Sequence, residues 1–105
     1  MIQVEFSVQD QAPAGFRISG HAGAGSAGQD IVCAAVSSAA YMTANTITDV
    51  IGAQPDVEVA DGLLRVFVAP PDRPQCDAVL RGLMLHLTQL AEQYPKNIHI
   101  TYTEV

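Results

Sequence analysis

Residues 30–52, DIVCAAVSSAAYMTANTITDVIG, contain no glycine or proline until Gly52, and alanine is their commonest residue. Alanine favours helix and glycine ends it, so the sequence predicts a helix from Asp30 to about Ile51. The first turns of this helix, IVCAAV, are apolar all round, which predicts burial on more than one side. The elements that cover this helix have to come from the sequence on either side of it.

On both sides of the predicted helix, apolar and polar residues alternate with the period of two that is typical of half-buried strands. The first nine residues, MIQVEFSVQ, place Ile2, Val4, Phe6 and Val8 on one face. The segment 12–15, APAG, then predicts a turn before a second strand, and Asp61-Gly62 predicts the tight turn of a second hairpin. The predicted strands cover residues 1–9, 16–20, 56–59, 64–68 and 98–103.

A second helix is predicted after the segment PPDRP at residues 70–74. Apolar residues recur at helical spacing from Cys76 to Tyr94, and Pro95 ends the pattern. The order of elements is ββαββαβ, with no repeat and no linker long enough to separate two domains. The sequence therefore predicts one α+β domain over residues 1–105, a two-layer sandwich in which two helices pack on one sheet of about five strands.

The charge and hydropathy of the chain limit its partners. Five Lys and Arg against eleven Asp and Glu give the 105 residues a net charge of −6, which opposes direct binding to nucleic acid. The longest apolar run, Ile31–Val36, is far shorter than the roughly 20 residues that cross a bilayer. The first ten residues also lack the features of a signal peptide. We therefore expect a cytoplasmic protein without a membrane or nucleic-acid partner, with both cysteines reduced.

Cys33 is the first candidate for chemistry, because the predicted helix places it near an N-terminus. Free backbone N–H groups and the helix dipole stabilise a thiolate there, and the amide of Cys33 could bind an oxyanion. The alternative is that Cys33 is a small buried residue of an apolar helix. His21, twelve residues upstream, could accept the thiol proton and return it to a leaving amine. Its alternative is an exposed loop histidine.

Two further polar residues lie beside Cys33 in the sequence. Asp30 has the spacing of an N-cap, and its alternative role is to orient His21 as a third catalytic group. Ser37 follows Cys33 by one helical turn, so its hydroxyl could touch the substrate or the imidazole, or bond to its own helix backbone. The remaining candidates have structural interpretations, with Cys76 in the core and His86 and His99 on the surface. One Cys and one His do not complete a zinc site, so no metal or other cofactor is expected.

A block of about eighteen residues resembles the ribosomal-processing cysteine proteases. It consists of Gly20-His21-Ala22-Gly23, then Gly28, then the segment 30–37, DIVCAAVS. The resemblance implies a small homodimeric enzyme that removes a short N-terminal extension from a large-subunit ribosomal protein. It also implies that Cys33 is the nucleophile and His21 its base. Ala24 departs from the aromatic residue found at this place in several members, and for a dimer the sequence itself offers only Leu85, off the apolar stripe of the second helix.

The segment between the predicted strand and helix is rich in small residues, which allows close approach to a ligand. We expect a mobile loop that closes over the peptide and positions His21. Its candidate substrate-contacting residues are Gly20, Ala22, Gly23, Gly25 and Gly28. Two other functions remain open: an anion-binding module at the junction of loop and helix, and a non-catalytic partner in ribosome assembly.

Overall fold

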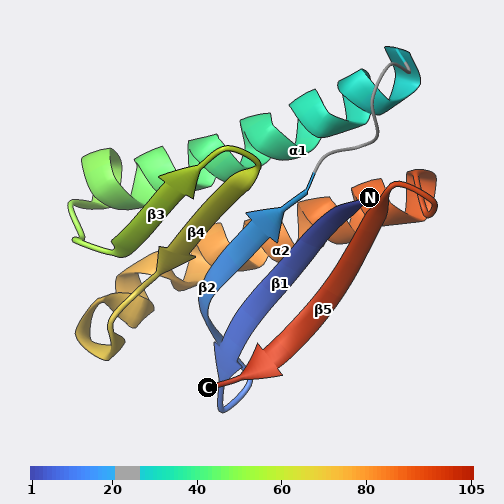
Figure 1. Ribbon diagram of the computed structural model, residues 1–105. Coiled ribbons are helices and arrows are strands. Elements are labelled where there is room, and N and C mark those ends of the chain that lie inside the picture. Colours follow the sequence, from blue (N-terminus) through green and yellow to red (C-terminus); the bar gives the residue numbers. More distant parts are fainter. Residues whose placement is uncertain (21–26) are drawn as a thin grey trace.

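The computed structural model describes the backbone of residues 1–20 and 27–105 and the side chains of residues 1–20 and 31–105. Five strands and two long helices alternate in the predicted order ββαββαβ, which confirms the α+β architecture (Figure 1). The elements are β1 (Ile2–Gln9), β2 (Ala12–Ser19), α1 (Ala27–Asn45), the π-helical η1 (Thr46–Ile51), β3 (Asp56–Ala60), β4 (Leu63–Phe67), the 3₁₀ helix η2 (Pro70–Asp72), α2 (Arg73–Gln93) and β5 (Ile98–Glu104).

The strands form one mixed sheet in the order β3-β4-β2-β1-β5. Neighbouring strands are antiparallel except for β1 and β5, which run parallel with Ile2 opposite Ile98. Both helices lie on the same face of the sheet, with α2 behind β1 and β2 and α1 toward the β3–β4 hairpin (Figure 1). The result is the expected two-layer sandwich.

The core lies between the sheet and the two helices. One face of β1, β2 and β4 supplies fully buried side chains such as Phe6, Phe16 and Val66, while Val36 of α1 and Leu80 of α2 close the core from the other layer. The period-two pattern of the strands and the helical spacing of α2 thus correspond to burial. Burial of such side chains contributes about 1.5–3 kcal/mol each.

The turn between β1 and β2 differs from the sequence expectation. The segment 12–15 is part of β2, and the chain turns at Asp10 and Gln11, which both have positive φ (51° and 69°). The prediction was wrong because Pro13 and Gly15 are residues typical of turns, but both lie within β2. A Cβ on Gly15 would lie 2.2 Å from the Val66 carbonyl oxygen, so only glycine allows this close approach of β4.

The first helix also begins earlier than predicted. α1 starts at Ala27, so Gly28 and Asp30 lie within the helix rather than in a loop and at an N-cap. The expected end is confirmed, because helical structure continues through η1 to Ile51. There Gly52, with φ of 82°, donates its N–H to the carbonyl of Ile47, which is the left-handed cap that glycine favours.

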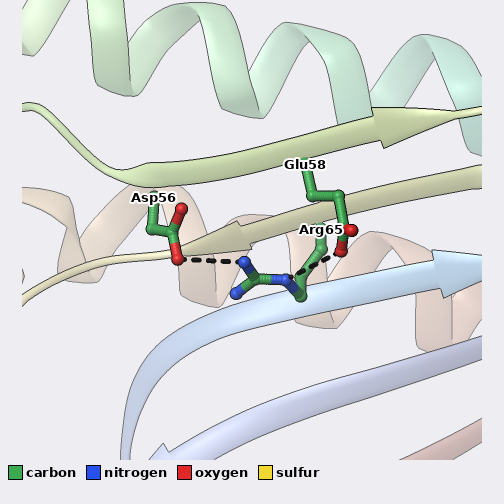
Figure 2. A network of polar contacts seen from close by, with 3 residues as sticks. All are labelled: Asp56, Glu58 and Arg65. Atoms are coloured by element: carbon green, nitrogen blue, oxygen red, sulfur yellow. Dashed lines mark hydrogen bonds and ion pairs between the residues drawn. The ribbon is translucent and has the colours of Figure 1, made fainter.

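Strand β3 is held to β4 by an ion-pair cluster on the face of the sheet away from the helices. The Arg65 guanidinium of β4 lies between two carboxylates of β3, with 2.9 Å from Nη2 to Asp56 Oδ2 and 3.3 Å from Nε to Glu58 Oε1 (Figure 2). Hydrogen bonds to Asp56 and then to Glu58 raise the pKa of Arg65. The cluster links residues that are already cross-strand neighbours and therefore supports the register of β3.

One helical segment of the described chain, Ile31–Ile51, is long and apolar enough to span a membrane by length and composition, with a mean hydropathy of 1.2. Core helices of globular domains pass the same test. Here the segment packs on the sheet through a stripe of buried residues, namely Val32, Val36, Ala40, Ala44 and Ile47. The length of this apolar segment was not expected, because the sequence analysis considered only uninterrupted runs.

Candidate active site

Cys33 lies on α1 with its thiol half-buried beside a cavity of about 180 Å³. The cavity is formed between α1 and the ends of several strands. Its lining from α1 is Cys33, Val36, Ser37, Ala40 and Tyr41, and its lining from the sheet is Ile2, Ile18, Gly20, Ala60, Gly62, Leu63 and Leu64. The thiol is therefore not sealed among aliphatic side chains, and a ligand can reach it.

Three polar or polarisable side chains of α1 share the cavity face. Cys33, Ser37 and Tyr41 follow one another at intervals of four residues, so they lie in a row along the helix. The Ser37 hydroxyl makes no hydrogen bond with any residue that the structure describes. By contrast, the Thr43 hydroxyl of the same helix donates to the carbonyl of Ala39 at 2.9 Å. Ser37 is thus exposed toward the cavity and not engaged by its helix backbone.

The position of Cys33 within the helix corrects one expectation. Because α1 begins at Ala27, Cys33 is the seventh helical residue and lies beyond the first turn. The helix dipole and the free N–H groups act within the first turn, so the expected help of the helix end to the thiolate and the expected oxyanion donor at the Cys33 amide were wrong. As a nucleophile, a thiol at this position would need a base from elsewhere in the chain.

The sequence assigns that base to His21, which lies outside the described residues together with Ala22, Gly23 and Gly25. Gly20 is the last described residue before His21, and it lines the cavity. Its N–H donates to the Gly62 carbonyl at 3.0 Å, and its φ of 89° belongs to the left-handed region. A Cβ on Gly20 would lie 2.6 Å from the Met1 carbonyl oxygen, so this position requires glycine. The chain thus reaches the cavity at the end of β2, at the residue that precedes His21.

The other titratable candidates have structural roles or surface positions. Cys76 of α2 is fully buried in the core, as predicted, and burial, with a smaller contribution from the charge of Asp72, raises the pKa of its thiol. His86 and His99 are exposed, as the sequence analysis expected. No group of three or more His, Cys, Asp and Glu side chains comes together within the described part of the chain.

Sequence analysis missed two parts of the cavity. Tyr41 lines it two helical turns beyond Cys33, and the spacing of eight residues was a signal that could have been used. The opposite wall, from Ala60 to Leu64, comes from the β3–β4 hairpin. Its position beside α1 follows only from the strand order of the sheet.

Known proteins are similar to this chain in sequence and in fold. The sequence model of the cysteine protease Prp family matches residues 1–99. The ribosomal processing cysteine protease Prp of Staphylococcus aureus is 29% identical, over 97% of this chain and 99% of its own length. Two crystal structures of Prp from S. aureus, one in complex with a substrate peptide and one with a covalently linked product peptide, superpose with TM-scores of 0.87 at 26% and 27% identity. Both alignments cover 98% of this chain and all of the other.

The family match covers most of the chain, including both walls of the Cys33 cavity. It favours a protease over an anion-binding module or a non-catalytic partner. The chain belongs to the cysteine protease Prp family and is a cysteine protease.

Proposed function

We propose that this protease removes a short N-terminal extension from a large-subunit ribosomal protein in the cytoplasm, with Cys33 as nucleophile. The observation that carries the proposal is the half-buried Cys33 thiol at an accessible cavity, in contrast to the fully buried Cys76. The relatives named as ribosomal processing proteases, one of them crystallised with a substrate peptide, support the substrate class. The excess of acidic residues also suits a basic ribosomal protein.

In the proposed mechanism, His21 accepts the Cys33 proton and the thiolate sulfur attacks the carbonyl carbon of the scissile bond. The C–N bond then breaks, and the imidazolium protonates the departing amine. Water, deprotonated by His21, attacks the resulting thioester and regenerates the thiol. Ser37, one helical turn after Cys33 at the same cavity, is proposed to contact the substrate or the imidazole, and Asp30 remains a candidate to orient His21. No step requires a cofactor.

The Gly-rich segment from Gly20 to Ser26, which ends where α1 begins, is proposed to close over the bound peptide. Most of this segment lies outside the described residues, so the proposal comes from its composition and from the position of Gly20 at the cavity. Replacing Gly23 and Gly25 by alanine restricts this segment, and we expect a higher KM for the peptide with little change in the stability of the core.

Mass spectrometry of the candidate ribosomal precursor tests the function directly. Wild-type protein should remove a short N-terminal peptide, whereas Cys33→Ala and His21→Ala should leave the precursor intact. Cys76→Ala is the matched control, because it removes a thiol far from the cavity and should retain cleavage at temperatures where it is folded. Cleavage by Cys33→Ala would refute the assignment of the nucleophile.

We further propose a homodimer. The supporting observation is that large apolar side chains remain exposed on both helices, including Leu85 (62%) on α2 and Met42 (64%) on α1. Met42 also lines a groove of about 580 Å³ between the helices. Sedimentation of wild type and Leu85→Asp tests this: the wild type should sediment as a dimer and the variant as a monomer, and a monomeric wild type would refute the proposal.

A further inference from the structure

The free edge of the sheet next to the cavity presents a defined set of backbone groups. The free edge belongs to β3, and the direction of its backbone groups follows from the bonds between β4 and β2. There the Val68 N–H donates to the Ala14 carbonyl at 2.8 Å, and the Gly20 N–H donates to the Gly62 carbonyl at 3.0 Å. Even-numbered residues of β4 therefore bond toward β2, and its odd-numbered residues bond toward β3. By the same alternation, the N–H and C=O groups of Val57 and Val59 in β3 point away from β4.

No strand of the described chain pairs with this edge, because β3 is the first strand of the sheet. The side chains of Val57 and Val59 face the helix layer, as their cross-strand partners Val66 and Leu64 do. The partners are buried (1% and 6% exposed), but Val57 and Val59 are 41% and 60% exposed. The side of β3 that the sequence pattern predicts to be buried is therefore only partly covered. This exposed apolar side lies next to the outward N–H and C=O groups of the same two valines.

This edge is continuous with the Cys33 cavity. Ala60, the last residue of β3, lines the cavity opposite Cys33, Ser37 and Tyr41. The row from Cys33 to Tyr41 is about 12 Å long at the rise of a helix, and Val57 to Ala60 is about 10 Å long at the rise of a strand. Figure 1 shows that α1 and β3 run in opposite directions, and residues of both line the cavity. An extended chain of three or four residues thus matches the distance along both walls.

The ion-pair cluster on the opposite face of the hairpin keeps this edge in place. Arg65 holds both Asp56 and Glu58, one on either side of Val57 (Figure 2). Because successive side chains of a strand point to opposite faces, these carboxylates lie on the far face of the sheet, away from the two valines. A natural edge strand is commonly protected by charge or by a covering element, but within the described residues Val57 and Val59 on the inner side of β3 remain 41% and 60% exposed.

We propose that an extended segment of the protein substrate, next to its scissile bond, adds to β3 as a sixth strand. The segment exchanges backbone hydrogen bonds with Val57 and Val59, and alternate side chains pack against these valines and Tyr41. This inference rests on the proposed protease function and extends it, because main-chain pairing would bind a peptide largely independently of its sequence. The cavity beside Cys33 would then select the side chains.

The first test uses the wild-type protein and a synthetic peptide that spans the cleavage site of the ribosomal precursor. A series of peptides is N-methylated at one backbone position each, which removes one N–H at a time. We expect KM to rise about five- to tenfold for each lost hydrogen bond, at alternate positions only. Equal tolerance of N-methylation at all positions would overturn the proposal.

The second test changes the protein. Val59→Pro removes the outward N–H without removing a bond to β4, at an edge position where proline is tolerated. KM for the unmodified peptide should rise about five- to tenfold with kcat nearly unchanged, while Val59→Thr, which loses apolar surface but keeps the N–H and the branched shape, should raise KM less than Val59→Pro does. An unchanged KM in folded Val59→Pro would contradict the pairing. If Val59→Pro does not fold, the N-methyl series decides.

Binding separates this inference from the proposed function. Fluorescence anisotropy of the labelled peptide with Cys33→Ala reports the β3 edge without cleavage. If N-methylation weakens binding at alternate positions but the wild type does not cleave the peptide, the proposed protease function is refuted and the pairing with β3 is supported. Cleavage that depends on Cys33 but shows no alternation would retain the function and refute the docking mode.

Discussion

Three glycines provide a graded test of what backbone strain and a close contact cost this fold, and one of them, Gly20, lies at the cavity. Gly20 combines a positive φ with a predicted clash, since a Cβ there would lie 2.6 Å from the Met1 carbonyl oxygen. Gly52 has a similar φ of 82° but open space around its Cβ position, and Gly82 in the middle of α2 has neither constraint. Substitution by alanine therefore adds strain and a clash at Gly20, strain alone at Gly52, and neither at Gly82.

The expected stabilities follow from these terms. A left-handed backbone costs about 1–2 kcal/mol for a residue with a Cβ, so Gly52→Ala should lose about that much. Gly20→Ala should lose about 2–3 kcal/mol, because the backbone near Met1 also has to shift. Gly82→Ala should gain about 0.5–1 kcal/mol, since alanine is the better helix former.

Thermal unfolding followed by circular dichroism measures the series. About 1 kcal/mol corresponds to about 4 °C in a domain of this size, so Tm should fall by about 8–12 °C for Gly20→Ala and about 4–8 °C for Gly52→Ala, and rise by about 2–4 °C for Gly82→Ala. Peptide cleavage below these temperatures should be reduced only in Gly20→Ala, which distorts the entry to His21. Equal Tm values for the Gly20 and Gly52 variants would refute the clash, and a lower Tm for Gly82→Ala would refute the helix argument.

Iodoacetamide near neutral pH should label Cys33 much faster than Cys76, as peptide mapping can show, because Cys76 is fully buried and burial raises the pKa of its thiol. The unfolded Cys76 thiol ionises at a pH of about 8.5, whereas the folded thiol keeps its proton to a higher pH. The stability that Cys76 contributes is therefore complete below the unfolded pKa and is lost as the pH rises through the raised pKa of the folded thiol. Cys76→Ala should flatten the decline of Tm at alkaline pH, and an unchanged slope would contradict this. Leu80→Ala should destabilise the fold by about 2–5 kcal/mol in urea unfolding, because it empties a fully buried site between α2 and the sheet, and a loss below about 1 kcal/mol would show that the core there collapses freely. Arg65→Gln should lower Tm slightly, and the difference from wild type should shrink as salt screens the exposed carboxylates; a difference that grows with salt would argue against the ion pairs.

Local sequence patterns were sufficient for most of the fold. The alternation in β1, the helical spacing in α2 and the Asp61-Gly62 turn each depend on neighbouring residues, and each was predicted correctly. The turn at Asp10 and Gln11 was missed because neither residue is a glycine and Gly15 offered a stronger local signal. The reason for Gly15 lies in β4, about fifty residues away in the chain, which local pattern analysis does not include.

The candidate site could be predicted only in part for a similar reason. Cys33 was singled out by its expected place near a helix start and by the resemblance, and Ser37 by its spacing of one helical turn from Cys33; the structure places both at one cavity. The helix start at Ala27 was missed because Asp30 has the residue type and spacing of an N-cap, and that error led to the wrong role for the helix end. The wall formed by Gly62 and Leu63, and the free edge of β3, result from the order of strands in the sheet, which no short window of sequence contains.

The parallel pairing of β1 with β5 has a consequence for biosynthesis. Ile2 lies opposite Ile98, so β1 leaves the ribosome more than ninety residues before its second neighbour does. Such distant contacts make folding slow, because the loop between them has to close first. Until then one side of β1 offers unpaired amides and carbonyls, which makes the nascent chain a candidate for chaperone capture. Ile2 also lines the Cys33 cavity, so this part of the cavity wall lies on a strand that gains its second neighbour only when β5 has paired with it.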